Sequence, residues 1–195
     1  KKGVSERQEI ALRIANAIDY VFPLAEMDIR TKMPFSHVAY KVNLPVRKVT
    51  GVEFERAKHE YERLLNKDKL DAMEGEYFKL GRSETTMERY ENQWDNPFFQ
   101  TQINVMRLGD IAIASNPFEM YLDYGIRIKA RSNALQTFIV QLAGDCVCYH
   151  GAGYLPSAKA FAGGGYGGEV ESNLVGPEGG KVLVEETLKL INGMW

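Results

Sequence analysis

Glycine is concentrated in one stretch of this chain, because most of its 18 glycines lie between Gly144 and Gly180. Glycine is favoured where the backbone must take a positive φ or approach another group closely. The stretch follows a turn with one carboxylate, residues 116–119, and an apolar segment, residues 137–143, that is typical of a buried strand. We therefore predict that loops at one edge of a sheet, between residues 116 and 168, form the functional site.

Alternation of apolar residues with period two predicts strands, and spacing of three to four residues predicts helices. The predicted strands are 38–46, 101–108, 111–114 and 137–143, with a two-residue turn at Gly109-Asp110. The predicted helices are 5–22, ended by Pro23, then 50–65, 120–131 and 180–192; Ser5 and Thr50 begin possible capping boxes. This order predicts an α/β or α+β fold, in which helices flank a layered sheet.

The length and composition are those of an ordinary globular domain, with 45% hydrophobic and 26% charged residues. We expect residues 1–195 to form one compact unit. Residues 67–96 are charged and weakly apolar, with Gly75 and Gly81 interrupting a helical spacing. We expect this segment to be a helical insertion.

Charge and hydropathy exclude two classes of partner. The formal net charge is -2 and the pI is about 6.0, so there is no basic excess for nucleic acid. No apolar run approaches the ~20 residues that a transmembrane helix needs. The two cysteines, Cys146 and Cys148, are one residue apart and are expected to be small core residues, not ligands of a structural zinc site.

Five short motifs occur in order in the second half of the chain. They are 108–113 (Leu-Gly-Asp-Ile-Ala-Ile), 117–119 (Pro-Phe-Glu), 125–129 (Gly-Ile-Arg-Ile-Lys), 153–157 (Gly-Tyr-Leu-Pro-Ser) and 164–166 (Gly-Gly-Tyr). Together they resemble the C-terminal part of the catalytic domain of the neutral/alkaline non-lysosomal ceramidase-like family, over roughly residues 100–195. Phe118 stands where that family usually has glycine, and no motif of the family is matched in residues 1–99.

The resemblance implies the C-terminal portion of a zinc-dependent amidohydrolase, which cleaves an N-acyl, sphingolipid-like amide with zinc-bound water. Glu119 and Tyr154 correspond to zinc ligands of the family, and Tyr166 corresponds to the tyrosine that assists at the amide carbonyl. Two further ligands are expected outside this chain, in an upstream half of the same protein, so the 195 residues alone are expected to be inactive. Family members are often exported, which suggests a periplasmic or secreted protein.

The residues by themselves leave other interpretations open. Glu119 can be a first-turn acid favoured by a helix dipole, Tyr154 an aromatic anchor and Tyr166 a residue that fixes its loop. The alternative function is a non-catalytic α/β module that binds a partner or assembles without metal. His37, His59 and His150 have no metal-ligand spacing. Residues 163–168 match the dinucleotide pattern G-x-G-x-x-G, but the segment before them is predicted to be helical, which disfavours a Rossmann loop.

Overall fold

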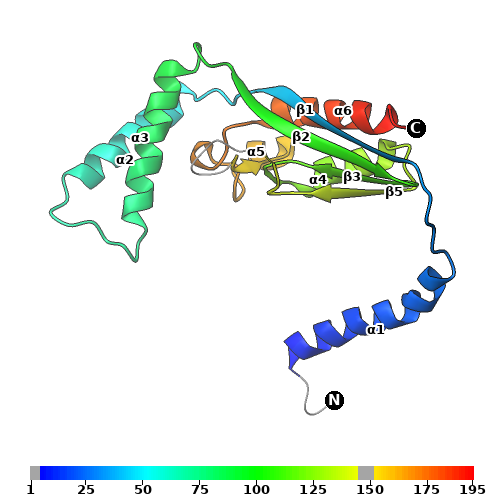
Figure 1. Ribbon diagram of the computed structural model, residues 1–195. Coiled ribbons are helices and arrows are strands. Elements are labelled where there is room, and N and C mark those ends of the chain that lie inside the picture. The colour runs from blue at the N-terminus through cyan, green and yellow to red at the C-terminus, as the bar shows by residue number, and fades with distance from the viewer. Residues whose placement is uncertain (1–4, 145–151) are drawn as a thin grey trace. The chain divides into compact units, whose positions relative to one another are not determined.

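The computed structural model describes residues 5–144 and 152–195 (Figure 1). The chain divides into two compact units, residues 1–34 and residues 35–195, and each is described by itself. Cys146, Cys148 and His150 lie outside the described residues, so the expectations for them are not addressed by the structure.

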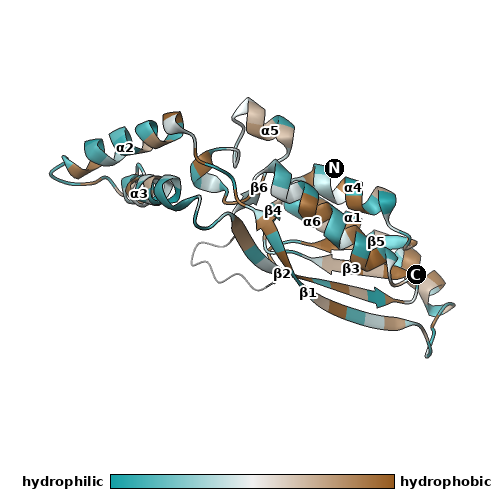
Figure 2. Cartoon of the chain, turned by 90° about the horizontal axis from the view of Figure 1, so that it is seen from above, coloured by the Kyte–Doolittle hydropathy of each residue, from teal (hydrophilic) through white to brown (hydrophobic). Residues whose placement is uncertain are grey.

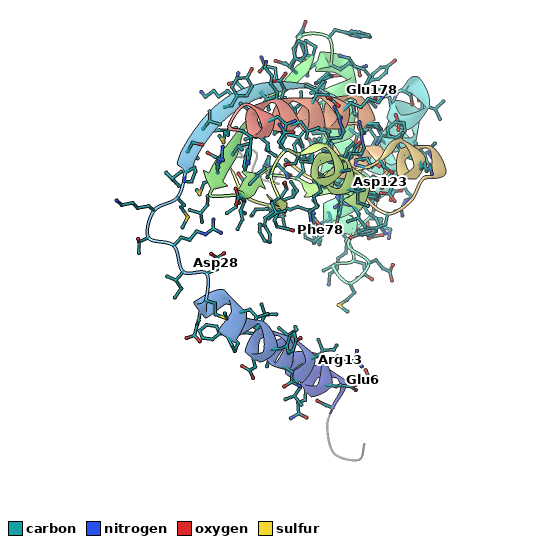
Figure 3. All side chains as sticks on the ribbon, turned by 90° about the vertical axis from the view of Figure 1, so that its right-hand side faces the viewer. Glu6, Arg13, Asp28, Phe78, Asp123 and Glu178 are labelled. Atoms are coloured by element: carbon teal, nitrogen blue, oxygen red, sulfur yellow. The ribbon has the colours of Figure 1, made fainter. Side chains whose placement is uncertain are left out.

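The first unit contains one long helix, α1 (Glu6–Glu26). The predicted capping box is present, because the Ser5 side chain accepts from the Gln8 backbone and the Gln8 side chain accepts from the Ser5 backbone. The prediction that Pro23 ends the helix is wrong. Pro23 begins the last turn, where its missing N–H removes only one backbone hydrogen bond, and the helix continues to Glu26. All of its residues are exposed, including Glu6 and Arg13 (Figure 3), so the expected packing of its apolar stripe stays a prediction.

The second unit is built on a mixed four-stranded sheet, which confirms the layered α/β class. Its strands are β1 (Phe35–Pro45), β2 (Phe98–Leu108), β3 (Ile111–Ser115) and β5 (Gln136–Val140), in the order β1-β2-β3-β5. The first two pairings are antiparallel and the β3–β5 pairing is parallel. The predicted two-residue turn at Gly109-Asp110 connects β2 to β3, and Gly109 takes a positive φ of 61° in it. Pro45 ends the edge strand β1, where its missing N–H removes no hydrogen bond from the sheet interior.

Helices α4 (Leu122–Arg131) and α6 (Pro177–Asn192) cover one face of this sheet (Figure 1). Alternate strand residues point toward them and form the core with apolar residues of α6. The buried side chains of this layer include Val42, Leu44, Phe99, Ile103, Val105, Leu183, Val184 and Ile191. Gly180 of α6 lies against the Tyr124 ring, where an added Cβ would be 2.4 Å from Cζ, so only glycine lets the two helices approach this closely.

The opposite face of the sheet is partly open. The strand register places Met106, Ile113 and Phe138 in one row across β2, β3 and β5 on this face. Phe138 and Val140 are 48% and 42% exposed. Brown apolar and teal polar residues alternate along the strands in Figure 2, as expected for a sheet with one covered face.

Helices α2 (Gly51–Leu65) and α3 (Glu76–Asn92) pack side by side within the second unit (Figure 2). Thr50 and Glu53 form the capping box that the sequence predicted for α2. Phe54 stacks on Tyr90 with 4.6 Å between ring centroids, which joins the two helices. The remaining elements are β4 (Glu119–Met120), β6 (Tyr154–Leu155), α5 (Ala158–Gly163) and the 3-10 turn η1 (Val170–Ser172). Among the described residues, no helix has the length and hydropathy needed to cross a membrane.

Candidate functional site

The candidate site lies just past the carboxyl ends of the parallel strands β3 and β5. The chain leaves β3 at Ser115 and forms β4 four residues later, while β5 ends at Val140. The Asn116 backbone donates to the Val140 carbonyl at 3.0 Å, and the Met120 backbone donates to the Gln141 side chain at 2.8 Å. The crevice outside the carboxyl ends of parallel strands is where α/β sheets generally place ligands.

The turn before Glu119 is fixed by its own side chains. The Asn116 side chain accepts a hydrogen bond from the Phe118 backbone at 3.1 Å. Phe118 is fully buried and meets Phe99 edge-to-face, with 5.8 Å between ring centroids. Phe118, at the position where the resembling family has glycine, therefore fills the core, and the next residue, Glu119, is only partly buried.

Glu119 and Tyr154 are opposite each other in a short parallel pair of strands. Their Cα atoms are register partners in the β4–β6 pairing. The Glu119 backbone donates to Gly153 at 3.0 Å and the Tyr121 backbone donates to Leu155 at 3.1 Å, so hydrogen bonds hold the pair on both sides. A carboxylate and a phenol from distant parts of the sequence thus lie side by side.

Tyr166 joins these two residues from the glycine-rich loop, which is formed by residues 163–168. Its ring is edge-to-face with that of Tyr154, with 5.4 Å between centroids and 71° between planes. Interactions with the Tyr166 hydroxyl, and next with the Glu119 carboxylate, raise the pKa of the Tyr154 phenol well above its usual value. The Tyr121 hydroxyl donates to the Tyr166 backbone carbonyl and so fixes this part of the loop. The Tyr166 side chain is itself 80% exposed and can reach a bound molecule.

Gly167 and Asn173 hold the loop against the Tyr154 ring, and of these two residues the sequence had not pointed to Asn173. Gly167 has a φ of 75°, and its backbone lies so close to the Tyr154 ring that an added Cβ would be 2.6 Å from Cγ. The Asn173 side chain, which is buried, donates to the carbonyls of Gly167 and Glu169 at 2.8 and 2.7 Å. Its oxygen accepts from the Arg47 guanidinium at 2.8 Å.

Arg47 connects the glycine-rich loop to the start of α2. One guanidinium nitrogen donates to both Gly168 and Asn173, and the other donates to Glu53 at 2.6 Å. The Arg47 side chain is 7% exposed, and its guanidinium also lies over the Phe161 ring at 4.3 Å. No periodicity or motif marks Arg47 or Asn173, because their importance arises from contacts across more than 100 residues of sequence.

The hydrogen bonds of the Tyr154 phenol predict that the free energy of unfolding depends on pH in the alkaline range. The folded state favours the neutral phenol, whereas the unfolded chain ionises it near pH 10. The resulting stabilisation is fully present below pH 10 and is lost as the pH rises toward the folded-state pKa. Urea unfolding of the wild type and Tyr154→Phe, with a chelator present, should show a wild-type advantage at pH 8 that shrinks by pH 11. An advantage that stays constant over this range would contradict the assigned hydrogen bonds.

The structure brings together all three residues that the sequence singled out, Glu119, Tyr154 and Tyr166. Within the described ranges, no group of three or more His, Cys, Asp and Glu side chains could hold a metal ion. His37 lies in β1 and His59 in α2, apart from these three residues in the fold. The segment before Gly163 is helix α5, not a strand, which confirms the reason for rejecting a Rossmann loop.

Comparisons with known proteins found no matching family model, no matching curated protein and no matching solved structure.

Proposed function

We propose that this chain is the C-terminal portion of a zinc-dependent amidohydrolase that resembles neutral ceramidase and cleaves an N-acyl, sphingolipid-like amide. The proposal rests on one observation: Glu119 and Tyr154 are strand partners, and Tyr166 contacts Tyr154 from the glycine-rich loop. These are the residues that correspond to two zinc ligands and a carbonyl-side donor in the resembling family. Because Glu119 and Tyr154 are far apart in the sequence, their proximity in the fold is independent support for the proposal.

The donor set is compatible with zinc. Carboxylate oxygen is an ordinary zinc ligand, and a phenol oxygen beside it supplies a second oxygen donor. Both side chains are partly buried at the carboxyl end of the sheet. Because a catalytic zinc ion needs three protein ligands, we propose that the remaining ligands come from outside these 195 residues. When bound, Zn²⁺ would act as a Lewis acid on the amide carbonyl and lower the pKa of water.

The residues of this chain have separate roles in the proposed reaction. Glu119 and Tyr154 would hold the ion, and the backbone bonds of β4 and β6 fix the distance between them. The exposed Tyr166 hydroxyl would donate a hydrogen bond to the amide oxygen as negative charge develops there. Gly167 keeps the loop backbone flat against the Tyr154 ring, so that the two tyrosines stay in contact.

Zinc content of the intact protein tests the assignment. Glu119→Gln keeps the size of the side chain but removes its charge, so zinc retention measured by elemental analysis should fall by at least about 100-fold. That is at or beyond the upper end of the ~10- to 100-fold effect of losing an outer-shell partner. Glu178→Gln is the matched control, because Glu178 is an exposed first-turn acid of α6 (Figure 3). Unchanged zinc content in Glu119→Gln would refute the ligand assignment.

A second variant separates chemistry from metal binding. Tyr166→Phe should retain zinc but lower hydrolysis of a fluorogenic N-acyl substrate by about 10²-fold or more, the usual effect of removing one oxyanion donor. The 195-residue chain alone should show no hydrolysis. Turnover by that piece would mean that the ligand set proposed here is wrong.

The alternative is a non-catalytic α/β module that binds a partner or assembles. The observation in its favour is the open face of the sheet, where Phe138 and Val140 are about half exposed. A protein that contains the intact upstream region but retains no zinc would favour this alternative.

A further inference from the structure

A cavity of about 300 Å³ lies between α3 and the junction of β1 and β2, and none of the three site residues lines it. One wall is apolar and includes two adjacent phenylalanines. It consists of Val46, Phe98, Phe99 and Leu174. The volume is at the lower end of the range of small-molecule sites.

The other wall carries a guanidinium group without a carboxylate partner. Arg89 donates to the Val170 carbonyl at 2.7 Å and to the Arg47 carbonyl at 3.5 Å. No carboxylate among the described residues forms an ion pair with it, in contrast to Arg47, which pairs with Glu53. Burial, followed by the positive charge of Arg47, lowers the pKa of Arg89 to about 10, and the more distant carboxylates of Glu53 and Glu171 offset this only in part. A largely desolvated cation with no carboxylate in direct contact is unfavourable, so this wall favours an anion.

The two carboxylates that act on Arg89 from a distance, Glu53 and Glu171, are each paired with another arginine, and Glu171 pairs with Arg56 at 3.0 Å. Arg47 is neutralised by Glu53 at 2.6 Å. The Lys48 ammonium donates to the Gln93 carbonyl and lies over the Trp94 ring at 4.4 Å. Glu88 is the one acid among the lining residues, and it is exposed at the rim. A single negative charge therefore suits the cavity better than a dianion.

We propose that this cavity binds a small monocarboxylate with an apolar or aromatic body. The carboxylate would accept hydrogen bonds from Arg89, whose planar fork matches its geometry. The body would pack against Phe98, Phe99 and Leu174. The proposal does not depend on zinc or on amide hydrolysis, because its residues are separate from Glu119, Tyr154 and Tyr166.

Calorimetric titration of the 195-residue chain with 3-phenylpropanoate tests the proposal. For a ligand of this size we expect a Kd on the order of 0.1 to 1 mM. Three further probes separate the contributions: 3-phenylpropanol lacks the charge, acetate lacks the body and inorganic phosphate supplies an anion alone. Each should bind at least about tenfold more weakly. Equal binding of 3-phenylpropanol or of phosphate would overturn the proposal.

Three variants test whether 3-phenylpropanoate binds in this cavity and not elsewhere on the protein. Arg89→Gln should weaken 3-phenylpropanoate at least tenfold, whereas Glu88→Gln, which removes the rim acid, should leave binding unchanged or strengthen it. Because Arg89 also ties α3 to η1, Phe98→Ser is a second test: this side chain is more than half exposed, so its loss should not unfold the protein. Phe98→Ser should weaken 3-phenylpropanoate and leave acetate unaffected. Wild-type affinity in Phe98→Ser or in folded Arg89→Gln would contradict the assignment.

Discussion

Replacing Arg47 with methionine should lower the free energy of unfolding by about 3 to 5 kcal/mol, the usual cost of removing one partner from a buried ion pair. Methionine fills a similar volume but donates no hydrogen bond. The substitution would leave Glu53, the Gly168 carbonyl and the Asn173 side chain without the donor that joins them. Urea denaturation followed by circular dichroism measures the loss.

Two further variants control for the loss of charge. Arg56→Met removes an exposed arginine that pairs with Glu171 at 3.0 Å, and should cost at most about 1 kcal/mol. Arg47→Lys keeps the charge next to Glu53 but cannot span Gly168 and Asn173, so it should be intermediate. If Arg47→Met lowers the free energy of unfolding no more than Arg56→Met does, the hydrogen bonds of Arg47 do not stabilise the glycine-rich loop.

Gly167→Ala should be the most damaging single-methyl change in the glycine-rich loop. Alanine would have to adopt a φ of 75°, and its Cβ would lie 2.6 Å from Cγ of Tyr154. The left-handed backbone costs about 1 to 2 kcal/mol, and the steric overlap adds about 1 to 3 kcal/mol. We therefore expect a loss of about 2 to 5 kcal/mol in urea denaturation.

Gly164 supplies a matched control in the same loop. Its φ is 61°, but an added Cβ would meet nothing within 4 Å, so Gly164→Ala should cost only the backbone term. A double-mutant cycle isolates the contact: in a Tyr154→Ala background, Gly167→Ala should cost no more than Gly164→Ala. An excess cost that persists in this background would show that the Tyr154 ring is not the obstacle.

Local signals in the sequence predicted the elements well. The two capping boxes, the Gly109-Asp110 turn and the alternation in β1, β2 and β3 all depend on neighbours in the chain, and all were found. The helix end at Pro23 was predicted wrongly because proline costs little when it lies in the last turn of a helix, as Pro23 does here. The predicted strand over residues 137–143 ends at Val140, and Leu142 takes a positive φ of 53°, which directs the chain into the site.

The site itself could be predicted only in part. Glu119, Tyr154 and Tyr166 were suggested by the order of short motifs, and the β4–β6 pairing explains why they meet. Arg47 and Asn173 carry no comparable signal, because an arginine before a capping box and an asparagine in a loop are both ordinary. Long-range contacts give them their role, and such contacts are absent from single-sequence patterns.

The Arg47 guanidinium holds the first turn of α2 through Glu53 and the glycine-rich loop through Gly168. Opening of either segment therefore removes one of the contacts that hold this guanidinium in place, and so weakens the attachment of the other segment. Local opening should release the start of the helical pair and the tyrosine-bearing loop as one cooperative unit. A molecule that binds to either segment would then reduce the local opening of both segments.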